Sequence, residues 1–309
     1  ISDDRSERNA ARFYKAQINI SNNKIDSVHF IEAVFLKNKD GNKYPGVDSD
    51  PFHTQDPEAI RYNPQTNTLT WASEGERTLR GETNILEDPA ITNITPAGNY
   101  LDTFALPPKM RMSSQQTGPR RNGVFEGLTF NDTYKYLFVN VEEPLYNDGS
   151  RAGLNDSTGI IRIIKLDVAS RKPVAEYGYA IDAVAYPPSP AGAFIINGIS
   201  DILSVAENKL LVIERSFSTG REGCTVKIYI ADLSNADDVK EMNSIKNKTV
   251  KTVRKKLLLN MDDLKIYIDN IEGVTFGPTL SNGHRSLLFI SDNNFDPREK
   301  TQLLLFEVN

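Results

Sequence analysis

Acidic residues recur in this chain beside short strand-like segments, in a pattern that could bind a cation. The clearest examples are two nearly identical segments, FEGLTF and IEGVTF, in which Glu126 and Glu272 precede a glycine. Two further segments, PEAIRY and ISDILSV, carry Glu58 and Asp201 at the matching position. The four acids lie roughly 70 residues apart, and such a fixed period indicates repeated structural units.

Each of these segments is followed by a turn and a second strand-like segment that also ends in an acid. The second acids are Glu74, Glu142, Glu214 and Asp292. In an antiparallel hairpin the first residue of one strand lies beside the last residue of the other, so we expect Glu126 and Glu142 to be neighbours. The glycines that follow the first acids, Gly127 and Gly273, would remove a side chain where backbones crowd together.

The elements that position these acids are predicted to be β-strands. Runs of β-branched and aromatic residues recur along the whole chain, separated by Asn, Gly, Asp and Pro clusters typical of hairpins and loops. Repeated units of three or four strands, closed into a ring, indicate one all-β domain, a β-propeller of mostly four-stranded blades. We expect five units, near residues 1–54, 55–123, 124–197, 198–269 and 270–309. Six blades are the alternative.

The two ends of the chain are expected to meet in one blade. The opening residues ISDDRS are similar to ISDNNF at 290–295, so we interpret residues 1–4 as the second strand of a unit that lacks its first. The last unit has room for only about three strands. We therefore expect N- and C-terminal strands to close the ring.

Composition and charge exclude several functional classes. The chain has 309 residues, 39% hydrophobic and 25% charged, which is typical of a globular protein. Its net charge of −5 gives no electrostatic reason to bind nucleic acid, and no apolar run is long enough for a membrane span. A single cysteine, Cys224, excludes an internal disulfide, and the signatures of serine esterases, zincins and P-loop enzymes are missing. Because the sequence begins with Ile1 and not with methionine, we expect a segment such as a signal peptide to have preceded it.

Many carboxylates around one axis repel one another, so positive charge must compensate them. One candidate is calcium, which accepts six to eight oxygen ligands in irregular geometry. The other is arginine, because Arg61, Arg121 and Arg215 lie close to the acidic motifs in the sequence. Metal and arginine together would bind a phosphate or carboxylate group. Alternatively the acids are structural, capping turns or pairing with the arginines.

This series of motifs resembles the phytase-like family of secreted bacterial proteins, described by an esterase-like activity of phytase. The likeness covers essentially the whole chain and is most specific in the blocks NGVFEGL at 122–128 and SDNNF at 291–295. It implies a β-propeller, export to the periplasm or cell surface, and a calcium-dependent phosphoester hydrolase. Propeller lactonases and phosphotriesterases hold calcium with Glu, Asn and Asp side chains. Their analogues by residue type are Glu126, Glu272, Asp292 and Asn293.

The leading hypothesis is therefore an extracytoplasmic hydrolase that uses calcium to cleave a small anionic substrate, a phosphoester or related ester. Glu58 joins the expected metal ligands, and either Glu142 or Glu214 would accept the proton of the attacking water. The residues expected to bind the anionic group are Arg61, Arg121 and Arg215. The alternative is a non-catalytic propeller that binds a protein, glycan or small ligand at its central channel.

Overall fold

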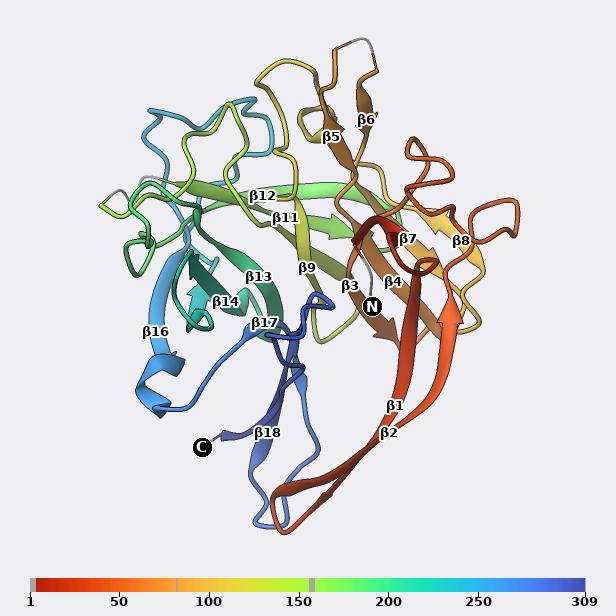
Figure 1. Cartoon of the computed structure of the whole chain (residues 1–309), viewed down its shortest axis with the longest axis vertical. Coiled ribbons are helices and arrows are strands. Elements are labelled where there is room, and N and C mark those ends of the chain that lie inside the picture. The colour runs from red at the N-terminus through yellow and green to blue at the C-terminus, as the bar shows by residue number, and fades with distance from the viewer. Residues whose placement is uncertain (1–3, 82, 156–158, 309) are drawn as a thin grey trace.

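The computed structural model describes residues 4–81, 83–155 and 159–308, and nearly all of their regular structure is β-strand. Three sheets have four antiparallel strands and a fourth has three. Figure 1 shows these sheets arranged around a common centre, so the fold is a four-bladed β-propeller. The all-β prediction is confirmed, whereas the expectation of five blades, or of six, is wrong.

Each blade is built from strands that are paired in the order in which they follow along the chain. The first contains β3 (Pro57–Asn63), β4 (Thr68–Ser73), β7 (Ala90–Ile94) and β8 (Tyr100–Thr103). The second contains β9 (Phe125–Phe130), β10 (Tyr136–Val141), β11 (Ile160–Asp167) and β12 (Lys172–Ala180). The third contains β13 (Ile195–Ala206), β14 (Lys209–Ser218), β15 (Thr225–Asp232) and β16 (Arg254–Asn260). The fourth contains β17 (Asn270–Phe276), β18 (Arg285–Asp292) and β19 (Leu303–Val308).

The remaining regular elements are short connections. A two-stranded ribbon of β5 (Glu76–Thr78) and β6 (Ile85–Glu87) interrupts the first blade. Three 3-10 turns complete the list, η1 (Asp4–Ser6), η2 (Pro108–Met110) and η3 (Met261–Leu264). No helix in the part of the chain that the structure describes is long and apolar enough to cross a membrane.

The hydrophobic core lies in layers between neighbouring blades. In β10, for example, Val139 and Val141 pack toward the first blade and Phe138 packs toward the third. This division follows from the two-residue period of a strand, which sends successive side chains to opposite faces. Similar layers join the second blade to the third and the third to the fourth.

Residues 4–35, the first part of the chain that the structure describes, form neither a fifth blade nor a fourth strand for the last blade. Within the described residues, β1 (Arg12–Ser21) and β2 (Lys24–Phe35) pair only with each other. The base of this hairpin packs on the first blade through Phe13 and Trp71. At its tip Asn23 Oδ1 accepts hydrogen bonds from the backbone N–H and the hydroxyl of Ser281, at 3.2 and 2.9 Å.

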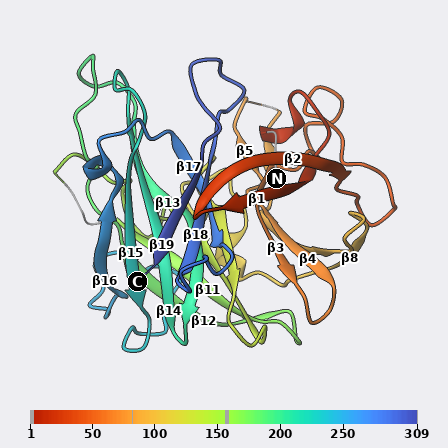
Figure 2. The ribbon, with the colours of Figure 1, turned by 90° about the horizontal axis from the view of Figure 1, so that it is seen from below.

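The expected closure by terminal strands is therefore wrong for the described residues. Figure 2 shows the hairpin running across from the first blade toward the fourth, so the ends of the ring meet through a hairpin contact. Among the residues that the structure describes, β19 pairs only with β18, so the blade of β17–β19 has three strands. Residues 1–3 of the predicted N-terminal strand lie outside the described residues, and residues 4–6 form η1 instead.

Candidate metal and anion site

Every blade has a β-bulge in its first strand, at or beside the repeated acid. The pairing skips Glu58 and Ala59 in the first blade, Glu126 in the second, Ser200 in the third and Glu272 in the fourth. A bulge bends the strand and turns a side chain away from the regular alternation. Three blades therefore present a glutamate at equivalent positions.

The third blade departs from the predicted repeat by one residue. Ser200 occupies its bulge and donates a hydrogen bond to a backbone carbonyl of the fourth blade at 2.8 Å. Asp201 falls where the second blade has Gly127. The Asp201 carboxylate accepts from Arg61 Nη2 at 2.8 and 2.6 Å and from the N–H of Val274 at 2.8 Å. It therefore links the first, third and fourth blades and is not part of the acid cluster.

The acids of the first two blades form one cluster. Asp56, Glu58 and Glu74 have carboxylate oxygens within 4.8 Å of one another, and so do Glu74, Glu126 and Glu142. The predicted proximity of Glu126 and Glu142 is therefore confirmed. Glu74 belongs to both groups, so the two sets of oxygens are continuous.

Burial makes this cluster unfavourable unless its charge is compensated. Burial raises the pKa values of Glu58, Glu74 and Glu126 well above the ordinary range, and repulsion from neighbouring carboxylates raises them further. Burial also raises the pKa of Glu142, but Arg215 opposes this shift. Either protons or a cation must therefore neutralise part of the cluster.

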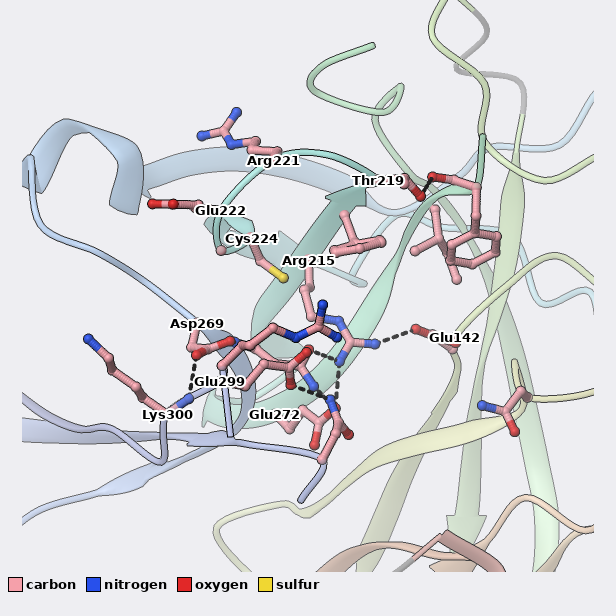
Figure 3. Close-up of a pocket in the computed structure, with 18 of the residues that line it drawn as sticks. Glu142, Arg215, Thr219, Arg221, Glu222, Cys224, Asp269, Glu272, Glu299 and Lys300 are labelled. Atoms are coloured by element: carbon pink, nitrogen blue, oxygen red, sulfur yellow. Dashed lines mark hydrogen bonds and ion pairs between the residues drawn. The ribbon is translucent and has the colours of Figure 1, made fainter. Parts of the chain in front are cut away.

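Arg215, on β14, lies against the acids from the third blade. Its Nη2 donates to Glu142 at 2.9 Å and its Nη1 donates to Glu272 at 2.6 Å, as Figure 3 shows. The Nη1 atom also donates to Asn270 Oδ1. These bonds hold the guanidinium between the second and fourth blades, beside the carboxylates.

Arg215 and several of the acids near it border a cavity of about 1200 Å³. Five of the residues predicted from the sequence line it, namely Glu58, Glu126, Glu142, Arg215 and Glu272. Its rim comes from segments 219–224 and 298–300, which follow β14 and β18. The cavity therefore brings together members of the acid cluster, Arg215 and loops from the third and fourth blades.

Three other predicted residues lie apart from the cavity with partners of their own. Arg61 is bonded to Asp201, as described above. Arg121 is largely exposed and its Nε lies 2.9 Å from a carboxylate oxygen of Glu76. Glu214 is buried and accepts hydrogen bonds from the Tyr179 hydroxyl at 2.7 Å and the Asp182 N–H at 2.9 Å. The structure therefore does not bring these three together with the acid cluster.

The two predicted ligands at the end of β18 also do not join the cluster. Asp292 and Asn293 accept backbone hydrogen bonds at 3.3 Å from Asn294 and Phe295 respectively. These bonds shape the loop after the strand. Neither residue lines the cavity in the described structure.

Two members of the cluster were not among the predicted site residues. Glu74 directly follows β4, the second strand of its blade, and was recognised only as part of the repeat. Asp56 stands two residues before Glu58, a spacing that puts two side chains on the same face of an extended chain. From the sequence, that spacing could have identified Asp56 as a site residue.

Comparisons with known proteins identify a family. A family model described as phytase-like, with esterase-like activity of phytase, matches residues 1–295. No curated protein matches the chain.

Three solved structures are similar at low sequence identity. An endo-arabinanase from Bacillus licheniformis is 13% identical with a TM-score of 0.37, over 96% of this chain and 89% of that one. A periplasmic gluconolactonase from Pseudomonas aeruginosa is 11% identical with a TM-score of 0.35, over 96% and 79%. A hydrazine synthase from Kuenenia stuttgartiensis is 13% identical with a TM-score of 0.36, over 87% and 67%.

Proposed function

The chain belongs to the phytase-like family, and we propose that it is a calcium-dependent hydrolase of a phosphoester or related ester, acting outside the cytoplasm. The description of the family, an esterase-like activity, supports a hydrolase in general terms. The observation that carries the proposal is the buried cluster of carboxylates, with Arg215 beside it, in the wall of a large cavity. The single cysteine is compatible with an extracytoplasmic location.

The donor set of the cluster fits a hard cation. Its oxygens all come from carboxylates, which are ligands that calcium prefers, and the flexible coordination of that ion needs no regular arrangement of them. Asp56, Glu58, Glu74 and Glu126 would hold the ion. Bound calcium would polarise an oxygen of the substrate and lower the pKa of a bound water.

Arg215 and Glu142 supply the remaining functions in this proposal. Arg215 would bind the anionic oxygens of the substrate, with Glu142 and Glu272 orienting its guanidinium. Glu142 would accept a proton from the attacking water, because its carboxylate lies in the cluster. The water oxygen bonds to phosphorus while the bond from phosphorus to the alcohol oxygen breaks, and the alcohol leaves with a proton from solvent.

Calcium titration of chelator-treated protein tests this proposal. We expect calcium to bind with micromolar or tighter affinity and to raise the melting temperature. Glu126→Gln should weaken calcium binding by at least about tenfold, because it removes a charged ligand. The matched control is Glu241→Gln, whose side chain is 91% exposed and does not belong to the acid cluster, and it should bind calcium normally.

Hydrolysis is measured on p-nitrophenyl phosphate with and without chelator. Turnover that is lost with chelator and in Glu126→Gln would support the hydrolase. Turnover that is indifferent to chelator would contradict the metal. Calcium binding without turnover of any phosphoester or lactone would favour the non-catalytic propeller.

A further inference from the structure

The cavity has an apolar side that the proposed chemistry does not use. Phe194, Ile196 and Phe217 line it, and Phe194 is 54% exposed. The ring centroids of Phe194 and Phe217 are 6.2 Å apart, with 39° between the ring planes. Open aromatic surface inside a cavity is typical of a ligand site, because a ligand can remove that surface from water.

The strand register fixes where this apolar side lies relative to Arg215. Ile196 is paired with Phe217 across β13 and β14. Arg215 and Phe217 both line the cavity and are two residues apart on β14, which places them on one face at about 7 Å along the strand. Phe194 is held farther out, because its carbonyl accepts from the N–H and hydroxyl of Thr219 at 3.0 and 2.9 Å.

A ligand with its anionic group at Arg215 would therefore extend its other end over the two rings. The direction is set by β14 itself, which runs from Arg215 past Phe217 toward Thr219 at the rim, as Figure 3 shows for Arg215 and Thr219. An aromatic group of the ligand could stack on Phe217 and Phe194 at the offset or tilted angles that ring pairs prefer.

Several cationic side chains around the cavity are paired with carboxylates of their own. These pairs are Arg151 with Glu143 at 2.8 Å, Arg221 with Asp262 at 3.2 Å, and Arg298 with Asp296 at 2.5 Å. Three further acids line the same cavity, Glu222, Asp269 and Glu299. Lys300 also lines the cavity, with its Nζ 5.0 Å from the centroid of the Tyr267 ring. Among the described residues, seven carboxylates and five cationic side chains line the cavity in total, so a substrate with several phosphates would be repelled and a ligand with one anionic group is favoured.

We infer that the substrate of this site is an ester with one anionic group and an aromatic group on its alcohol side, which packs on Phe194 and Phe217. The inference rests on the proposed function and narrows its substrate class. It assigns Phe194 and Phe217 to specificity, while the carboxylates and Arg215 bind the reacting group.

The test compares methyl phosphate and phenyl phosphate, which share the anion and differ in the ring. Their Kd values are measured by titration calorimetry in the presence of calcium. We expect phenyl phosphate to bind about tenfold more tightly, because its ring moves from water to the apolar side of the cavity. Phe194→Ala should reduce that ratio to about twofold or less. The control Phe52→Ala removes a phenylalanine that is 48% exposed outside the cavity, and it should keep the tenfold ratio.

The outcomes separate the inference from the proposed function. Equal Kd values in the unmodified protein would overturn the aromatic subsite and leave the anion site intact. A tenfold ratio that survives in Phe194→Ala would also overturn it, since the ring would then lie elsewhere. If neither phosphate binds with calcium present, the proposed function fails and this inference fails with it.

Discussion

At the scale of single residues, the repeated glutamate–glycine pair meets two separate requirements. Glu126 occupies a bulge and contributes to the acid cluster. A Cβ atom on Gly127 would lie 2.5 Å from Asn140 Oδ1 and 2.7 Å from Asp201 Cα, so the glycine allows strands of two blades to approach. The glutamate supplies a carboxylate to the acid cluster, and the glycine allows the close packing of two blades.

Gly127→Ala should therefore destabilise the protein by about 1–3 kcal/mol, because the clash involves backbone of the third blade. Urea denaturation measures the loss. Gly178→Ala is the matched control, since its nearest neighbour is a methyl group of Ile160 at 3.1 Å, which can shift. Equal losses in the two variants would show that close approach at the centre is not the reason for the glycine.

The buried acids also predict a pH dependence of stability. Burial raises the pKa of Glu143 to about 7 and that of Glu87 to about 8, from ordinary values of 4.5. A group whose pKa is higher in the folded state binds protons more strongly there, so its stabilisation is complete below pH 4.5 and is lost as the pH rises through the folded value. The free energy of unfolding of chelator-treated protein should therefore fall between about pH 5 and 8, as measured by denaturant titration.

Calcium binding should have a pH dependence of its own, because protons and calcium compete for the carboxylate oxygens of the acid cluster. Glu58, Glu74 and Glu126 have raised pKa values and bind protons more readily as the pH falls. The rise in melting temperature caused by calcium should be larger at pH 8 than at pH 5. A rise that is the same at both pH values would argue against calcium binding at these acids.

At the scale of elements, a buried ionic cluster holds the second blade to the long segment after β15. Arg162 on β11 is completely buried and donates to Asp148 at 2.6 and 3.0 Å and to Glu176 at 2.7 Å. It also donates to the carbonyls of Val239 and Met242 at 3.3 and 3.0 Å. One side chain thus orders a loop that has little regular structure.

Arg162→Met should cost about 3–5 kcal/mol, because Asp148 and Glu176 would remain buried without this partner. Hydrogen exchange should show lost protection in residues 237–245, a segment in which Arg162 donates to the carbonyls of Val239 and Met242. The control Arg254→Met changes a side chain that is 70% exposed and 3.6 Å from Asp232, and should cost less than about 1 kcal/mol. A similar cost in both would mean that the cluster does not order the loop.

At the scale of the whole molecule, the ring is closed by side chains that cross its centre. Arg61 of the first blade reaches Asp201 of the third, and its Nη2 lies 3.3 Å from the carbonyl of Val274 in the fourth. The N-terminal hairpin adds a second connection between the first and fourth blades through Asn23. Closure of the ring therefore depends on contacts between residues that are distant in the sequence.

A double-mutant cycle on Arg61→Met and Asp201→Asn tests the central connection. Each single change should cost about 3–5 kcal/mol, and the double variant should cost clearly less than the sum. The comparison pair is Arg171 and Asp102, which are 33% and 45% exposed and 2.9 Å apart, with an expected coupling below about 1 kcal/mol. Additive losses for Arg61 and Asp201 would show that their contact does not close the ring.

Part of the site was predictable because it depends on local pairing. The two acids of a hairpin lie at fixed distances from one turn, so their proximity follows from strand pairing alone, as Glu126 and Glu142 show. The all-β class and the repeat follow in the same way from the alternation of strands and turns. Membership of the phytase-like family was also visible in the motif blocks.

The number of blades and the partners of the distant residues were decided by the tertiary structure. The acidic repeat does not reveal that Ser200 takes the bulge while Asp201 reaches Arg61, because a one-residue shift in register changes the direction of a side chain. The tyrosine that donates to Glu214, Tyr179, comes from the adjacent blade, and β1 and β2 lie on the first blade instead of forming one. Local sequence patterns thus predicted the strands, the repeat and the acids within each hairpin. Which acids share a cavity depended on how separate blades pack, since that packing joins residues far apart in the chain.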